Sequence, residues 1–128
     1  MTGIRAIVPI LRSFDEGQAR DFYLRYLGFD IVFEHRFGPD MPLYMGVALA
    51  GFEVHLSEHH GDATPGSALR IEMADVGAYH AALRERGHPR ANPGIQDQEW
   101  GWREVSVTDP SGNRLIFCSP LVGKGSPP

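Results

Sequence analysis

The chain has 128 residues, of which 42% are hydrophobic and 22% charged, with a formal net charge of −4, and these values are typical of one globular domain. Acidic and basic residues are interspersed, which excludes the basic stripe of a nucleic-acid-binding surface, and the single cysteine, Cys118, excludes an intrachain disulfide. No apolar run is long enough for a membrane span and no signal peptide is recognisable, so we expect a cytoplasmic protein.

The predicted elements occur in the same order twice along the chain. The first half has a strand pattern over residues 4–11, a helix pattern over 15–27, and strand patterns over 29–35, 43–49 and 53–57. The second half has a strand over 68–73, a helix over 76–86, and strands over 92–96, 104–108 and 114–119. Each half is therefore βαβββ, and the turn-rich segment over residues 61–66 is the predicted link between them.

Local signals support both predicted helices. Residues 13–16 fit a capping box at the start of the first helix, and Gly28 fits its C-terminal end. Asp75 can cap the start of the second helix, and Gly87 can end it. In the first helix one face is apolar, made of Ala19, Phe22, Tyr23, Tyr26 and Leu27.

The most informative stretch is a predicted hairpin over residues 98–117. Val105 and Val107 alternate with polar residues in its first strand, as do Leu115 and Phe117 with their neighbours in the second. Between them, the sequence DPSGN over 109–113 has the composition of a tight turn. Trp100 and Trp102 stand at the start of this hairpin.

This hairpin resembles the last hairpin of the glyoxalase/bleomycin-resistance/dioxygenase superfamily, also called the vicinal oxygen chelate superfamily. The N-terminal string AIVPILRSFDEGQARDFYLRYLGF is similar to the opening of bleomycin-binding resistance proteins, as is the pair Trp100-Gly101 before the hairpin. The resemblance covers nearly the whole chain. It implies an α+β fold in which two βαβββ modules, at about 4–58 and 66–119, form a curved sheet cup. It also implies a homodimer in which a strand containing Pro9 is exchanged between subunits.

Strand alternation predicts which side chains line that cup. The apolar sets would pack against the helices: Val8, Ile10, Met45, Val47, Val54, Leu56, Leu69, Ile71, Val105, Val107, Leu115 and Phe117. The opposite sets would face the cup: Ile7, Pro9, Tyr44, His55, Ser57, Arg70, Glu72, Glu104, Ser106, Arg114, Ile116 and Cys118. An alternative is that this face is simply solvated, with pairs such as Arg70 and Glu104 formed within it.

The resemblance also implies where a metal would be held in the enzymes of this superfamily. The corresponding positions here are Ile7, His55, about Gly66, and Ile116. Only His55 can ligate, and one imidazole does not make a transition-metal site. We therefore expect no metal and no cofactor, which argues against glyoxalase, dioxygenase and metal-dependent thiol transferase chemistry. His59 and His60 are interpreted as loop histidines.

The function that the resemblance implies is sequestration of a bleomycin-type small molecule without chemical change, giving antibiotic resistance. Phe33, Phe37 and Trp100 match aromatic positions of the bleomycin-binding family. The full set of predicted ligand-binding residues is Phe33, Phe37, Tyr44, His55, Arg70, Glu72, Trp100, Trp102, Glu104 and Arg114. Two alternatives stay open. One is a non-classical enzyme that uses His55 as acid or base and Arg70 to hold an anionic substrate, and the other is a regulatory or structural dimer.

Overall fold

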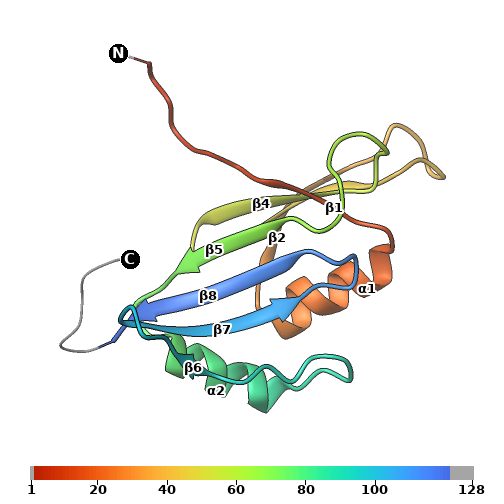
Figure 1. Ribbon diagram of the computed structural model, residues 1–128. Helices are drawn as coiled ribbons and strands as arrows, with labels where there is room; N and C mark the ends of the chain where they lie inside the picture. The colour runs from red at the N-terminus through yellow and green to blue at the C-terminus, as the bar shows by residue number, and fades with distance from the viewer. Residues whose placement is uncertain (1, 122–128) are drawn as a thin grey trace. The chain divides into compact units, whose positions relative to one another are not determined.

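The computed structural model describes residues 2–121, and the chain divides between Pro65 and Gly66 into two compact units (Figure 1). Each unit contains one four-stranded sheet and a helical segment. The predicted α+β class is therefore confirmed. No helix among the described residues is both long and apolar enough to cross a membrane.

In the first unit the helical segment follows one short strand and precedes three longer ones. The elements are β1 (Ile10–Arg12), α1 (Glu16–Arg20), η1 (Asp21–Tyr26), β2 (Asp30–His35), β3 (Tyr44–Leu49) and β4 (Phe52–Ser57). The sheet order is β1-β4-β3-β2, with β1 parallel to β4 and the other pairs antiparallel.

The helical segment begins one residue after Asp15, whose carboxylate accepts a hydrogen bond from the Gln18 amide at 2.8 Å. The predicted capping box from Ser13 is wrong, because Asp15 takes that role and the Ser13 amide instead bonds the Ser57 carbonyl. After Arg20 the helix widens into π geometry and ends at Tyr26, with Leu27 as its C-cap and Gly28 next at φ 87°. The five residues of the predicted apolar face are all buried.

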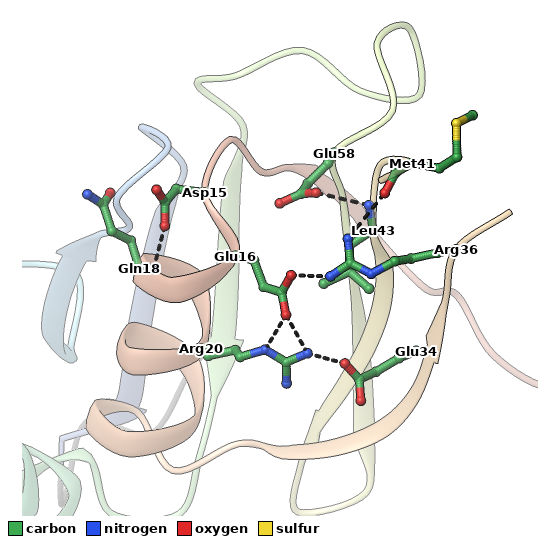
Figure 2. Close-up of polar contacts among 9 residues, drawn as sticks. All are labelled: Asp15, Glu16, Gln18, Arg20, Glu34, Arg36, Met41, Leu43 and Glu58. Carbon is green, nitrogen blue, oxygen red and sulfur yellow. Dashed lines mark hydrogen bonds and ion pairs between the residues drawn. The ribbon is translucent and has the colours of Figure 1, made fainter. Parts of the chain in front are cut away.

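The helical segment of the first unit is fastened to β2 by ion pairs. Figure 2 shows Glu16 between Arg20 and Arg36, with Arg20 also reaching Glu34 on β2. The pair within the helix measures 2.8 Å between Arg20 Nη2 and Glu16 Oε2. Glu34 lies beside Met45 in the register, on the buried face of the sheet, so these charges fix the helix over that face.

The core of the first unit follows the predicted alternation except at its first strand. Met45, Val47, Val54 and Leu56 are buried, as expected. In β1, however, Leu11 is buried beside Leu56 while Ile10 is 40% exposed beside His55. The prediction that Ile10 packs against the helix is therefore wrong, because Leu11 is the residue of β1 that is buried. The predicted strand over residues 4–11 is also mostly wrong, because the segment before Ile10 is extended but outside the sheet (Figure 1).

The second unit repeats the layout with a longer helix. Its elements are β5 (Ala68–Glu72), α2 (Val76–Arg86), β6 (Gln96–Asp97), β7 (Trp102–Thr108) and β8 (Arg114–Pro120), in the sheet order β5-β8-β7-β6. Figure 1 shows α2 alongside the sheet, and its contacts are with β7 and β8. The strand predicted over 92–96 is largely wrong, since only Gln96 and Asp97 pair with β7.

Caps and a turn close the second unit as predicted. The Asp75 carboxylate accepts from the Ala78 amide at 3.1 Å, and α2 ends at Gly87 with φ 68°. In the turn between β7 and β8, the Asp109 carboxylate accepts from the Ser111 and Asn113 amides, both at 2.8 Å. Val105, Val107, Leu115 and Phe117 are buried, which confirms the predicted core of this hairpin.

Candidate functional site

A cluster of three rings occupies the face of the first sheet opposite the helix. The centroids of Phe33 and His55 lie 5.1 Å apart and those of Tyr44 and His55 5.3 Å apart, both pairs edge to face. Phe33 and Tyr44 are stacked, with centroids 6.0 Å apart and planes inclined by 18°. These three residues come from β2, β3 and β4. The structure thus brings together three of the predicted ligand-binding residues, and we call them the aromatic cluster.

A glycine makes room for the aromatic cluster. Gly46 lies between His55 and Phe33 in the register of the sheet. A Cβ atom at residue 46 would stand 2.7 Å from Phe33 Cδ1 and closer still to Cε1, so no other residue fits beneath the ring. Covering a strand glycine with a cross-strand aromatic ring also stabilises a sheet. The contact therefore serves the fold as well as the exposed surface.

A β-bulge in β2 aims Phe33 at this face. Ile31 pairs with Val47 and Phe33 with Gly46, so Val32 is the extra residue in the strand. In an unbroken strand, Ile31 and Phe33 would lie on the same face. The bulge instead leaves Ile31 on the side of the buried Val47 and turns the Phe33 ring to the side of His55.

Hydrogen bonds hold two of the three rings in place. Tyr44 Oη lies 2.8 Å from His55 Nδ1, and His55 Nε2 lies 2.8 Å from Glu53 Oε2. Burial raises the pKa of the Tyr44 phenol, and the nearby Asp62 carboxylate raises it further. Tyr44 is thus kept in its protonated form. Both ring nitrogens of His55 are hydrogen-bonded within the protein, so neither is available to exchange a proton with a substrate.

Phe37 is not part of the aromatic cluster. Its ring is 77% exposed and contacts His35 and His59, with centroids 4.7 and 6.1 Å away. His59 follows β4 and His60 forms an isolated bridge with Ala63, so both lie in the loop region where they were expected.

In the second unit the predicted charged residues pair with each other. Arg70 Nη1 lies 2.6 Å from Glu104 Oε2, and Gln98 donates to the other Glu104 oxygen at 3.3 Å. The hydrogen bond to Glu104 raises the pKa of the Arg70 guanidinium above its ordinary value. The guanidinium carbon also lies 5.2 Å from the centre of the Trp102 ring. The alternative of internal pairing on this face is therefore realised at Arg70.

The two tryptophans have different environments. Trp100 precedes β7 and is 50% exposed, so part of this residue is accessible to a ligand. Trp102 is the first residue of β7 and is only 2% exposed. Its indole N–H has no hydrogen-bond acceptor among the described residues, a costly arrangement for a buried donor.

The remaining predicted positions of the second sheet differ in exposure. Glu72 and Arg114 are exposed on β5 and β8. Cys118 lies between Glu72 and Glu104 in the register but is fully buried, and burial raises the pKa of its thiol. Ser57 of the first unit is likewise buried, with its hydroxyl donating to Asp62 at 2.7 Å. The register places Ser57 beside Tyr44 and Cys118 beside Glu104, on the predicted face, but both side chains are buried there.

The residues at the expected metal positions do not form a ligand set. Ile7 lies outside β1 and is 91% exposed, and the β1 residue beside His55 is Ile10, which is also apolar. Ile116 pairs with Arg70, and Gly66 precedes β5. No group of three or more His, Cys, Asp or Glu side chains suited to a metal ion occurs within residues 2–121.

Sequence reasoning missed two residues that shape the aromatic cluster. Glu53 fixes one nitrogen of His55, and its position two residues earlier on the same strand was a usable signal, because such residues share a face. Gly46 was missed because its role depends on which residue of β2 lies opposite it.

A family model described as a glyoxalase superfamily protein matches residues 1–124. The chain belongs to the glyoxalase superfamily. Each unit has one sheet and a helical segment, and the first strand of each sheet pairs in parallel with the last. This layout agrees with the assignment. A search among curated proteins found no match.

Solved structures of the superfamily have the same fold. An antibiotic-binding protein, TnmS3 from Streptomyces sp. CB03234, has a TM-score of 0.70 at 25% identity, over 94% of this chain and 98% of that one. A glyoxalase/bleomycin resistance protein from the same organism has a TM-score of 0.67 at 26% identity, over 88% and 98% of the two chains. A bleomycin-binding protein solved with bleomycin has a TM-score of 0.68 at 23% identity, over 91% and 98%.

Proposed function

We propose that this protein binds a flat aromatic antibiotic of the bleomycin type and sequesters it without chemical change. The observation that carries the proposal is the aromatic cluster, whose rings lie on a sheet face away from the helix and whose leading ring, Phe33, is 37% exposed. Aromatic rings in this arrangement offer a stacking surface to planar ligands. The antibiotic-binding and bleomycin-binding members of the superfamily support the ligand class.

The binding proposal extends to the rest of the predicted set. In the second unit, taken by itself, Trp100 would offer a stacking ring, and the exposed Glu72 and Arg114 would contribute charge. In the first unit Phe37 would act at the margin of the ligand, and in the second unit Trp102, Arg70 and Glu104 would act by holding their neighbours. Pairing of Arg70 with Glu104 cancels a positive charge that would repel a cationic ligand.

The enzyme alternative has less support from the geometry. It requires His55 as acid or base, but His55 is held between Tyr44 and Glu53. It also requires Arg70 to bind an anionic substrate, but that guanidinium is held by Glu104. Each residue would have to leave its partner before it could act.

A homodimer and a cytoplasmic location remain predictions of this proposal. The extended segment before β1 exposes apolar side chains, with Ile4 at 74% and Ile7 at 91% exposure, and a second subunit would cover them if the N-terminal strand is exchanged. Sedimentation at micromolar concentration tests this. A monomer that still binds the ligand would remove both the dimer and the exchange from the proposal.

The experiment that tests sequestration combines binding with recovery of the ligand. Purified protein is titrated with metal-free bleomycin while tryptophan fluorescence is followed, and the mixture is then denatured and analysed by mass spectrometry. We expect saturable quenching and full recovery of unchanged bleomycin. Absence of binding to bleomycin and to related bithiazole compounds would contradict the ligand class, and a modified product would contradict sequestration.

A further inference from the structure

The side chains of Glu53, His55 and Tyr44 form a continuous hydrogen-bonded chain on one sheet face. The two links each measure 2.8 Å, from Glu53 Oε2 to His55 Nε2 and from His55 Nδ1 to Tyr44 Oη. Glu53 and His55 are alternate residues of β4, and Tyr44 lies on the adjacent β3. The side chains of His55 and Glu53 are 18% and 36% exposed, so the chain lies at the surface without being fully solvated.

For a neutral His55, the number of hydrogens available sets the direction of both hydrogen bonds. A carboxylate only accepts, so the link to Glu53 requires a hydrogen on His55 Nε2. A neutral imidazole carries one N–H, and Nδ1 is then an acceptor. Tyr44 must therefore donate its single hydroxyl hydrogen to His55. What Tyr44 can still offer to another molecule is an oxygen lone pair.

The charged groups near Tyr44 also bear on its hydroxyl. Asp62 is close enough to act on the phenol, and it accepts a hydrogen bond from Ser57, the register partner of Tyr44. Arg12 of β1 pairs with Ser57 on its other side, and the Arg12 guanidinium donates to the Glu58 backbone carbonyl at 2.6 Å. Across the sheet, the residues in register with His55 are Ile10, Gly46 and Phe33, and none of them carries a charge. The negative charge of Asp62 acts on the phenol and favours the protonated hydroxyl.

We propose that the Glu53–His55–Tyr44 chain makes Tyr44 Oη a dedicated acceptor, so that the aromatic cluster selects flat ligands that donate a hydrogen bond from an N–H or O–H group. The ligand ring lies against Phe33, and its donor points to Tyr44 Oη. This inference deepens the proposed function, on which it rests, by naming the group that the ligand must present. Ligands that present only acceptors at this point bind less well, because their lone pairs face that of Tyr44.

The direction of the hydrogen bonds from Tyr44 through His55 to Glu53 is tested first, without any ligand. Two-bond nitrogen–proton correlation spectra of nitrogen-15-labelled protein at about pH 8, above the ordinary titration range of imidazole, distinguish the tautomers of His55. We expect the Nε2–H form. An Nδ1–H tautomer or a doubly protonated ring at this pH would overturn the inference, because Tyr44 would then no longer be required to donate to His55.

The selection itself is tested with two matched flat cations. The probes are protonated 4-(dimethylamino)pyridine, which has a ring N–H donor, and its N-methyl analogue, 1-methyl-4-(dimethylamino)pyridinium, which has none. Chemical-shift titration of the Phe33 and His55 signals measures both affinities. We expect the N–H cation to bind roughly three- to tenfold more tightly, the effect of one net hydrogen bond. Tyr44→Phe should remove this preference, and Tyr79→Phe, a control in the second unit, should retain it.

The outcomes separate this inference from the proposed function. If bleomycin binds but the two cations bind equally well to the wild type, or neither binds, the inference fails while sequestration stands. A preference that survives Tyr44→Phe also overturns the inference. If neither bleomycin nor either cation binds, both proposals fail together. The Nε2–H tautomer together with a preference that disappears in Tyr44→Phe supports the inference.

Discussion

Phe33 occupies the space that a side chain at Gly46 would need. The ring lies directly over the glycine on the neighbouring strand, with Cδ1 2.7 Å and Cζ 3.1 Å from the position of a Cβ atom. Because Phe33 also stacks on Tyr44 and meets the edge of His55, any movement of this ring disturbs the whole aromatic cluster.

Replacement of Gly46 by alanine should therefore weaken both the fold and the binding of flat ligands. Forcing one methyl group beneath the ring costs about 1–3 kcal/mol of unfolding free energy, and we expect bleomycin affinity to fall roughly tenfold as the stacking surface is lost. Urea unfolding and fluorescence titration measure the two effects. Gly94→Ala is the matched control, because a Cβ there meets open space at an ordinary φ. Equal effects of the two variants would contradict this account.

Trp100 should contribute ligand affinity through its exposed ring. If it stacks on a planar ligand, Trp100→Ala should cost about 1–3 kcal/mol of binding free energy. The buried Trp102 remains as a fluorescence reference in that variant. Calorimetry with bleomycin gives the affinity independently of fluorescence. An unchanged affinity, together with turnover of an anionic substrate that disappears in His55→Ala, would favour the enzyme alternative.

The Glu16 ion pairs should make stability depend on pH. Hydrogen bonds from Arg20 and then Arg36 lower the pKa of Glu16 in the folded protein. A lowered pKa stabilises the fold above the unfolded-state value of about 4.3, and this stabilisation is lost as the pH falls through the folded-state pKa. The Glu16 side chain is 36% exposed, so solvent screening limits the effect.

Glu16→Gln should accordingly cost only about 0.5–1 kcal/mol at pH 7, and the difference from wild type should shrink towards pH 3. Urea unfolding at several pH values measures it. Glu85→Gln on the exposed side of α2 is the control and should have no such pH-dependent effect. A difference that stays constant down to pH 3 would show that the charge of Glu16 is not the cause.

Purified protein should contain no stoichiometric transition metal, because Ile7, Ile10 and Ile116 cannot ligate and His55 is bonded to Tyr44 and Glu53. Elemental analysis of protein prepared without an affinity tag measures this. One equivalent of zinc, nickel, iron or manganese per chain that disappears in His55→Ala would contradict the prediction.

The features that sequence predicted well depend on short-range patterns. Alternation placed Met45, Val47, Val54 and Leu56 in the core because these strands are regular and long enough to show period two. The turn at Asp109 and the end of α2 at Gly87 were predicted for the same local reason. At β1 the pattern failed, because only three residues pair and an apolar residue lies on each face.

The arrangement of the aromatic cluster depends on long-range register, which local patterns do not contain. Phe33 was selected by family resemblance, and Tyr44 and His55 by their alternation, but nothing in the sequence showed that the three rings touch. Their contact requires that Gly46 lies opposite Phe33, and that pairing exists only because β2 contains a bulge. Pairing of Arg70 with Glu104 was anticipated only as an alternative, since strand order decides it.

β2 contributes one side chain to the core and one to the aromatic cluster, and the extra residue Val32 lies between them. On one side of it Ile31 faces the buried Val47, and on the other Phe33 faces His55. Substitutions at residue 33 can therefore alter ligand preference while the interior packing stays as it is. Deletion of Val32 would make Ile31 and Phe33 neighbours in a regular strand, where they would still face opposite sides and keep the same partners. Among relatives of this chain, a one-residue gap at this point is thus expected to preserve both the packing of Ile31 and the aromatic cluster, whereas a gap elsewhere in β2 would turn one of these side chains to the wrong face.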